Sequence, residues 1–191
     1  MSESPQATLG IIGLGLIGGS FARALKQAGV VKSVAGFDLR SHEVNTALRL
    51  GVIDVACNCV SELADRADMI VLATPVRAIE SILRELQPCL KSHHIITDVG
   101  SVKGAVVATV NRVFGNVLPG FVPGHPIAGS EKSGVAAATP DLFKDHKVIL
   151  TPLADTATTA LDHVARMWRL TGANVLMMSP DHHDEVLAAT S

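Results

Sequence analysis

Short, almost continuous apolar runs alternate along the chain with longer stretches in which apolar residues recur every three or four positions. Apolar runs of this length between turn residues are typical of buried strands, and the three-to-four spacing is typical of amphipathic helices. The pattern predicts strands at 9–12, 33–37, 69–73, 94–97, 148–151 and 174–178. It predicts helices at 16–28, 41–50, 76–86, 102–114, 157–170 and 181–191.

Strand and helix alternate in this prediction, and the strands are apolar along their whole length. Such strands are typical of a parallel sheet covered by helices on both faces. We therefore expect an α/β fold of the doubly wound, Rossmann type with a mostly parallel sheet. Gly29 and Gly51 are natural helix terminators, and Ser41 is the expected N-cap of the second helix. The stretch 135–147 has the least regular pattern, and we expect a loop there that borders the functional site.

The last predicted helix starts at Asp181, after Ser179 and Pro180, and continues to the final residue, Ser191. Its pattern fits two interpretations equally well. It is either a short terminal helix docked on the sheet or the beginning of a connection to a further domain. We assign a nucleotide-binding domain to residues 1–179 and the start of this helix to residues 180–191.

Composition narrows the possible partners. The chain has 191 residues, 48% of them hydrophobic, which is enough for one substantial core. The formal net charge is −2 and no block of Lys and Arg is present, so nucleic acid and anionic membranes are poor candidates. No apolar run approaches the ~18 residues that a membrane span requires, and the polar N-terminus does not resemble a signal peptide. Cys57, Cys59 and Cys89 show no disulfide pattern, so we expect free thiols and a cytoplasmic location.

Three glycines form a G-x-G-x-x-G motif directly after the first strand and at the start of the first helix. This is the context that a dinucleotide-binding loop requires. Gly13 permits the tight turn, Gly15 lets a pyrophosphate approach the backbone, and Gly18 lets helix and strand pack closely. The helix start at Leu16 and Ile17 offers free N–H groups and a partial positive charge to phosphates. The alternative is an ordinary strand-to-helix turn.

Asp38 ends the second predicted strand, 20 residues after Gly18. A carboxylate at this position accepts hydrogen bonds from the ribose hydroxyls of the adenosine and repels a 2′-phosphate. It therefore predicts NAD rather than NADP as cofactor. Arg40 argues the other way, because a nearby arginine can accommodate the 2′-phosphate.

Ligands of open α/β folds bind at the carboxyl ends of the strands. We expect three segments at that edge of the sheet: residues 73–75, 98–101 and 124–126. We assign Thr74 and Pro75 to the cofactor. His125 lies in an expected turn, where an imidazole can accept the proton that an alcohol loses as its hydride leaves. The alternative is a structural turn histidine.

Further polar groups accompany this histidine. Ser101 follows a glycine at the end of another strand, where it could orient His125 or contact a nicotinamide. Ser130 and Glu131 offer hydrogen-bonding groups to a polar substrate.

Four segments in this order resemble the prephenate dehydrogenase family: GLGLIGGSFARAL from residue 13, TDVGSVK from 97, GHPIAGSEKSGV from 124 and KVILTP from 147. The third is far more specific than the glycine motif, and the similarity covers residues 9–191. The resemblance implies NAD-dependent oxidative decarboxylation of prephenate or arogenate in tyrosine biosynthesis. Hydride leaves the carbon that bears the hydroxyl, carbon dioxide leaves the opposite carbon, and the ring becomes aromatic. The product is 4-hydroxyphenylpyruvate or tyrosine.

The resemblance also implies roles for individual residues. His125 matches the histidine that hydrogen-bonds the ring hydroxyl and assists its deprotonation. Ser101 matches the serine that contacts this histidine and the nicotinamide, and Ser130 and Glu131 match positions that line the substrate pocket. The three motif glycines and Asp38 match cofactor positions.

The family continues beyond the H-D-x-x-x-A-x-x-S pattern, here at 183–191, into a helical domain. That domain supplies an arginine for the substrate carboxylate and most of the dimer interface. We therefore expect this chain to be the nucleotide-binding part of a longer, homodimeric protein, with little turnover of its own.

Two other functions are compatible with parts of this pattern. Hydroxyacid or 6-phosphogluconate-type NAD dehydrogenases share the fold but lack the H-P-I-A-G stretch. A module that senses NAD without chemistry needs no proton-accepting histidine. We predict no metal site: His182, His183 and Asp184 are adjacent, so they point to different sides of a helix, and we expect a solvated helix start there.

Overall fold

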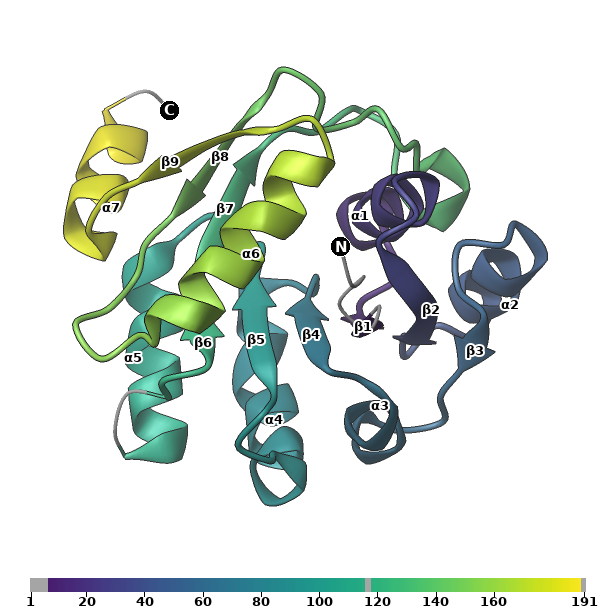
Figure 1. The fold of residues 1–191 in the computed structure, drawn as a ribbon, viewed down its shortest axis with the longest axis horizontal. Coiled ribbons are helices and arrows are strands. Elements are labelled where there is room, and N and C mark those ends of the chain that lie inside the picture. Colours follow the sequence, from purple (N-terminus) through teal and green to yellow (C-terminus); the bar gives the residue numbers. More distant parts are fainter. Residues whose placement is uncertain (1–6, 116–117, 190–191) are drawn as a thin grey trace, which may run out of the picture.

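A six-stranded parallel sheet forms the centre of the protein, and we describe it from a computed structural model that covers residues 7–115 and 118–189. The strand order is β3-β2-β1-β4-β5-β6, and every neighbouring pair is parallel (Figure 1). The strands are β1 (Ala7–Ile12), β2 (Val31–Phe37), β3 (Val55–Ala56), β4 (Met69–Leu72), β5 (Ile95–Asp98) and β6 (Phe121–Val122). This arrangement confirms the predicted doubly wound fold.

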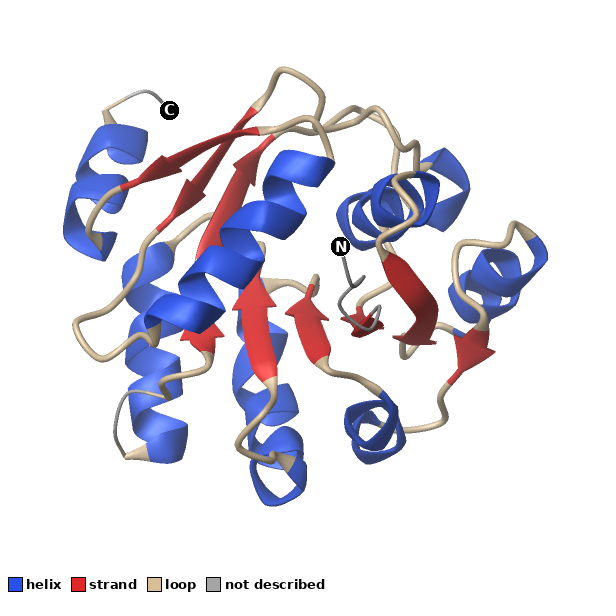
Figure 2. Ribbon diagram, viewed as in Figure 1, coloured by secondary structure: helices blue, strands red, loops and turns tan. Residues whose placement is uncertain are grey.

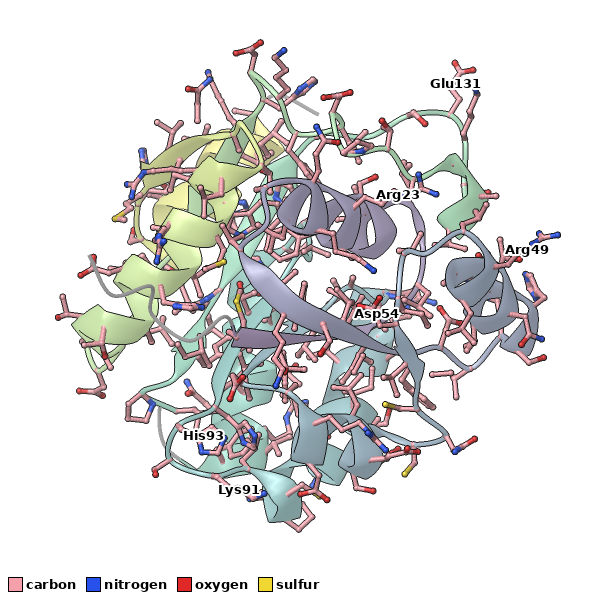
Figure 3. All side chains as sticks on the ribbon, turned by 45° about the vertical axis from the view of Figure 1, so that its right-hand side comes forward. Arg23, Arg49, Asp54, Lys91, His93 and Glu131 are labelled. Atoms are coloured by element: carbon pink, nitrogen blue, oxygen red, sulfur yellow. The ribbon has the colours of Figure 1, made fainter. Side chains whose placement is uncertain are left out.

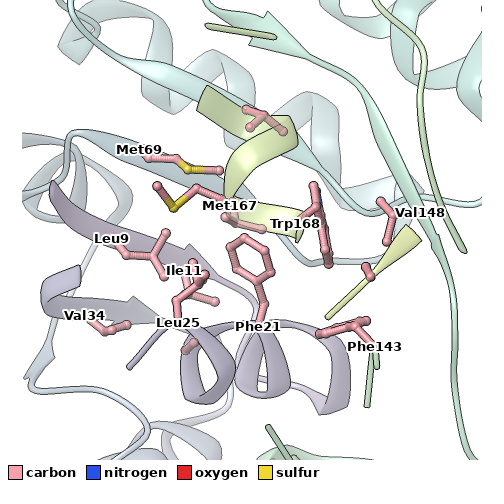
Figure 4. Packing of buried hydrophobic residues seen from close by; sticks show 14 of the residues in the cluster. Leu9, Ile11, Phe21, Leu25, Val34, Met69, Phe143, Val148, Met167 and Trp168 are labelled. Atoms are coloured by element: carbon pink, nitrogen blue, oxygen red, sulfur yellow. The ribbon is translucent and has the colours of Figure 1, made fainter. Parts of the chain in front are cut away.

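Helices cover both faces of this sheet (Figure 2). One face carries α1 (Leu16–Gln27), α2 (Ser41–Arg49) and α6 (Thr158–Leu170), and the other carries α3 (Val60–Arg66), α4 (Val76–Leu86) and α5 (Lys103–Phe114). Each face has its own buried apolar cluster. On the first, Trp168 packs against Phe21 and Phe143, with ring centroids 4.4 and 5.1 Å apart (Figure 4). None of the helices in the described ranges is long and apolar enough to cross a membrane.

A second, three-stranded sheet follows the first and corrects the sequence prediction. It has the order β7-β8-β9, with β7 (Gly124–Ile127) antiparallel to β8 (Lys147–Leu150) and β9 (Asn174–Met177) parallel to β8. His125 therefore lies in a strand opposite Ile149, and the prediction of a turn was wrong. Pro126 has no N–H group and suggested a turn, but β7 is an edge strand, where a proline is tolerated.

Several element boundaries also differ from the prediction. The short elements β3, β6 and α3 were missed, because two to seven residues show too little periodicity. Ser41 is the first helical residue rather than the N-cap, which is Arg40. Gly29 and Gly51 end their helices with φ values of +68° and +65°, as expected. The irregular stretch 135–147 contains a 3₁₀ helix (Val135–Ala137) that packs against α1 and α2, and it contributes Val135, Ala138 and Phe143 to the buried residues, while most of its other residues are exposed or half-buried.

The last helix, α7 (Pro180–Ala188), packs against α5 (Figure 1), and its His183 ring contacts His125 of β7, an edge strand of the second sheet. Ser179 is its N-cap and accepts a hydrogen bond from the His182 backbone N–H. The predicted end at Ser191 lies outside the described residues. The three cysteines are free, as predicted, but Cys57 is buried and Cys59 is exposed.

Candidate functional site

A cavity of about 570 Å³ opens at the carboxyl ends of β1, β2 and β4. Six of the residues that sequence reasoning assigned to the cofactor line it: Gly13, Gly15, Asp38, Arg40, Thr74 and Pro75. Leu16, Ile17, Gly18 and Ser101 are not in its lining. The prediction missed the contribution of Leu39 after β2, of the segment that follows β3 and of α4, which together add Leu39, Asn58, Cys59, Ser81, Ile82 and Glu85. These side chains come from short or surface elements without a motif of their own.

The three glycines of the motif differ in the space that is available for a side chain. Gly13 has φ +100°, and a Cβ there would lie 2.4 Å from the Ala73 carbonyl oxygen. A Cβ on Gly18 would lie 2.4 Å from the Gly13 carbonyl oxygen, so both positions require glycine for the fold itself. A Cβ on Gly15 would meet nothing within 4 Å, so the space beside this backbone is open to a ligand.

Hydrogen-bond donors lie beside Gly15 and at the cavity wall. Helix α1 begins after Gly15 with no side-chain cap, so the N–H groups of its first turn have no intrahelical acceptors. The Thr74 hydroxyl is buried at the cavity and has no hydrogen-bond partner among the described residues. Free N–H groups at a helix N-terminus and an unpaired hydroxyl fit the phosphates of a dinucleotide.

Asp38 is held firmly at the cavity wall. Its carboxylate accepts hydrogen bonds from the backbone N–H groups of Leu14 and Arg40, each at 2.8 Å. The Arg40 guanidinium lies 3.3 Å from an Asp38 oxygen and 3.3 Å from a Glu43 oxygen. Because two carboxylates already hold Arg40, it is less available to a 2′-phosphate. Glu43, which the sequence analysis missed, also accepts from the Val135 N–H and ties α2 to the stretch 135–147.

A second group of polar side chains surrounds His125. Its Nδ1 lies 2.8 Å from His183 Nε2, and His183 Nδ1 lies 2.7 Å from Asp184 Oδ1. The His183 side chain is fully buried, so the expectation of a solvated helix start was wrong for this residue. The two rings meet edge to face, with centroids 5.1 Å apart.

Asp184 links this group to helix α5. Its Oδ1 accepts from the Lys103 backbone N–H at 2.9 Å and its Oδ2 from the Gly104 N–H at 2.8 Å. The N-cap of α5, Val102, has no capping side chain, so a carboxylate from α7 performs this function. Negative charge at a helix N-terminus is favourable, because the N–H dipoles point toward it.

A fully buried ion pair lies beneath His125. The Lys103 ammonium donates to Asp98 Oδ2 at 2.5 Å and to the Gly124 carbonyl oxygen at 2.6 Å. Asp98 in turn accepts from the N–H groups of Gly124 at 3.2 Å and Gly100 at 2.8 Å. Both backbone polar groups of the residue before His125 are therefore held by this pair. Burial lowers the pKa of Lys103, and Asp98 opposes that effect.

The surroundings of His125 keep its ring neutral. Its pKa is lowered to about 4, chiefly by burial and to a lesser extent by the His183 ring and the Lys103 ammonium, while Asp184 acts in the opposite direction. A neutral imidazole has one protonated nitrogen and one nitrogen with a free lone pair. At neutral pH this ring can therefore accept a proton.

The other residues predicted for catalysis and for the substrate pocket, Ser101, Ser130 and Glu131, are exposed. The structure pairs His125 with His183, whereas Ser101 is exposed, so its proposed contact with His125 stays a prediction. Ser130 and Glu131 are exposed in the loop after β7, and Glu131 points outward from the loop (Figure 3). Within residues 7–115 and 118–189, no group of three or more His, Cys, Asp and Glu side chains is arranged to hold a metal ion.

Comparison with known proteins identifies a family for this arrangement. The family model described as prephenate dehydrogenase, nucleotide-binding domain, matches residues 21–177. The chain is 39% identical over 183 residues to cyclohexadienyl dehydrogenase of Zymomonas mobilis, covering 96% of this chain and 62% of the relative. It is 40% identical over 185 residues to prephenate dehydrogenase of Bacillus subtilis, covering 96% of this chain and 50% of the relative.

A solved structure shows the same fold. Prephenate dehydrogenase from Aquifex aeolicus, in complex with hydroxyphenyl propionate and NAD+, has a TM-score of 0.89 and 38% identity, covering 98% of this chain and 64% of that one. The chain thus spans about half to two thirds of the length of these relatives.

Proposed function

This chain belongs to the prephenate dehydrogenase family, and from that premise we propose that it is the nucleotide-binding part of an NAD-dependent enzyme that oxidatively decarboxylates prephenate or arogenate. The observation that carries the proposal is the position of the His125 imidazole just beyond the carboxyl end of β5, in surroundings that lower its pKa. Strand β5 neighbours β4, whose end lines the cavity, so a proton acceptor and a dinucleotide-sized cavity share one edge of the sheet.

The residues of the cavity fit NAD. Asp38 would accept hydrogen bonds from the adenosine ribose, and the start of α1 with Thr74 would bind the phosphates. Leu16, Ile17 and Gly18 would form the helix start, and Pro75 would form part of the cavity wall. When bound, NAD+ supplies the hydride acceptor.

His125 would take the proton of the substrate's ring hydroxyl. As the hydroxyl carbon gives up its hydride, it becomes a carbonyl, and the opposite carbon then loses carbon dioxide. The electron pair of that carbon–carbon bond enters the ring and makes it aromatic, the carbonyl oxygen becomes a phenolate, and this oxygen takes back the proton from His125 to give the phenol. Ser101 would contact His125 and the nicotinamide, and Ser130 and Glu131 would line the substrate pocket. We further propose that the whole protein is a cytoplasmic homodimer, in which a region beyond this chain completes the substrate site.

Two measurements test the proposal. Calorimetry with the 191-residue chain should detect NAD+ binding, because the lining of the cavity lies within it. In the natural full-length protein, prephenate or arogenate should yield NADH. His125→Asn should lower kcat by about 10²–10⁴-fold, the usual contribution of a general base, with little effect on NAD+ affinity.

An exposed histidine gives the matched control. The His146 side chain is exposed and its Nδ1 bonds the neighbouring Lys144 carbonyl group, so His146→Asn should leave both kcat and NAD+ affinity unchanged. Absence of NADH with both substrates would overturn the proposed reaction. Normal turnover in the His125 variant would remove this residue from the mechanism.

A further inference from the structure

We propose that His183 and Asp184 are positioning residues that hold the His125 ring in one tautomer, with Nδ1 protonated and Nε2 free to accept the substrate's proton. The inference rests on the proposed function for the identity of that proton. The arrangement of the three side chains, by contrast, is a property of this chain alone.

The tautomer of His125 follows from Asp184, which is the hydrogen-bond acceptor at the end of the series His125, His183, Asp184. An ionised carboxylate has no hydrogen to donate, so the 2.7 Å contact requires that His183 Nδ1 donates to Asp184. In a neutral His183 ring, Nε2 then carries a lone pair. The 2.8 Å contact to that lone pair requires that His125 Nδ1 carries a hydrogen. The remaining nitrogen of a neutral His125, Nε2, is left as the proton acceptor.

Asp184 is fixed as a charged acceptor by helix α5. Burial raises its pKa, but the hydrogen bonds from the Gly104 N–H, His183 and the Lys103 N–H outweigh that effect and leave the pKa below its ordinary value. The two N–H donors belong to the first turn of a twelve-residue helix, so they hold the carboxylate in place. Asp184 therefore has a definite orientation toward His183.

Other charged groups near His125 do not compete for its Nδ1. Lys103, from α5, directs its ammonium to Asp98 of β5 and to the Gly124 carbonyl oxygen. His183 is fully buried, so its ring is shielded from bulk solvent. Side chains from α7 thus determine which nitrogen of His125 is protonated.

Nitrogen-15 NMR of the histidine rings tests the tautomer directly on the 191-residue chain. At pH 7, we expect the His125 Nδ1 signal at the shift of a protonated nitrogen and the Nε2 signal at that of an unprotonated one. His183→Leu removes the acceptor while filling similar space, so the His125 signals should move toward the average of two exchanging tautomers. His182→Leu is the control, because His182 is exposed and adjacent in sequence. A wild-type His125 protonated at Nε2, or unchanged signals in His183→Leu, would overturn the inference.

Kinetics of the full-length enzyme separate positioning from a structural role. His183→Leu should lower kcat by about 10–100-fold, as loss of an orienting partner typically does, while KM and NAD+ affinity stay near normal. His183→Gln should recover part of the loss, because its amide oxygen can accept from His125 Nδ1. Asp184→Asn should resemble His183→Leu, because its amide group can donate to His183 Nδ1 and invert both tautomers.

The outcomes distinguish the inference from the function on which it rests. A wild-type enzyme that forms no NADH from either substrate overturns the proposed function, while the NMR result still decides the tautomer. If the wild type is active and His183→Leu and His183→Gln lower kcat equally, the proposal that His183 positions His125 is overturned. That result would indicate that His183 has a packing role. Unfolding followed by Trp168 fluorescence shows whether each variant is folded, since Trp168 is the single tryptophan of the chain and is fully buried.

Discussion

Replacing Lys103 by Met should destabilise the protein strongly, because it leaves a buried carboxylate without its counter-ion. Lys103 and Asp98 have fully buried side chains and lie 2.5 Å apart. In the variant, Asp98 keeps only the N–H groups of Gly100 and Gly124, and the Gly124 carbonyl oxygen loses its ammonium donor. Methionine preserves the length and apolar contacts of the stem, so the loss is mainly electrostatic.

The magnitude follows from what becomes unpaired. Removing one partner of a buried ion pair typically costs about 3–5 kcal/mol. For a chain of this size each kcal/mol lowers Tm by about 2–4 °C, so we expect a decrease of roughly 6–20 °C. Lys26→Met is the matched control, because Lys26 makes its 2.6 Å ion pair with Asp54 at the surface. Exposed pairs contribute about 0–1 kcal/mol.

Urea unfolding followed by Trp168 fluorescence measures both variants. A second substitution sharpens the result: adding Asp98→Asn to Lys103→Met removes the stranded charge. The double variant should be more stable than Lys103→Met alone by about 1–3 kcal/mol, within the range of coupling between contacting residues. If Lys103→Met costs no more than Lys26→Met, or if Asp98→Asn makes it worse, the buried pair does not stabilise the fold as argued.

Three further predictions concern the cofactor loop and His125. Gly18→Ala should abolish NAD+ binding in calorimetry or unfold α1, since its Cβ would lie 2.4 Å from the Gly13 oxygen; normal affinity would contradict that steric argument. NAD+ should bind more tightly than NADP+ by about 1–3 kcal/mol, and Asp38→Ser should narrow this gap; equal dissociation constants in the wild type would refute the role of Asp38. The pKa of His125 is lowered from its ordinary value of 6.5 to about 4 in the folded protein. Between pH 4 and 6.5 the unfolded chain therefore binds more protons at this residue than the folded chain does. His125 thus makes the free energy of unfolding rise with pH in this range. Denaturant titrations at pH 4.5 and 7 should show a smaller pH dependence in His125→Asn, and an unchanged dependence would refute the assignment.

Features that depend on residues close together in the chain could be predicted from the amino-acid sequence. Apolar runs and helical spacing predicted the order of most strands and helices of the doubly wound fold, because each element's buried face is encoded in its own residues. The glycine loop and Asp38 were also predictable. Gly13 and Gly18 are required by contacts within one strand–turn–helix unit and its neighbour β4, and Asp38 ends the adjacent strand.

Contacts between side chains that are far apart in the sequence depend on how the elements pack in three dimensions. His125 and His183 are 58 residues apart, and Asp184 caps a helix that begins 81 residues earlier. Adjacent histidines at a helix start suggest a solvated surface, and a lysine at the first position of a helix suggests the same. Burial of His183 and Lys103 arises because α7 and β7 pack against the start of α5, and no local periodicity encodes that packing. The cavity glycines could therefore be predicted from sequence, whereas the surroundings that keep His125 neutral, and that we propose fix its tautomer, depend on how distant elements are assembled.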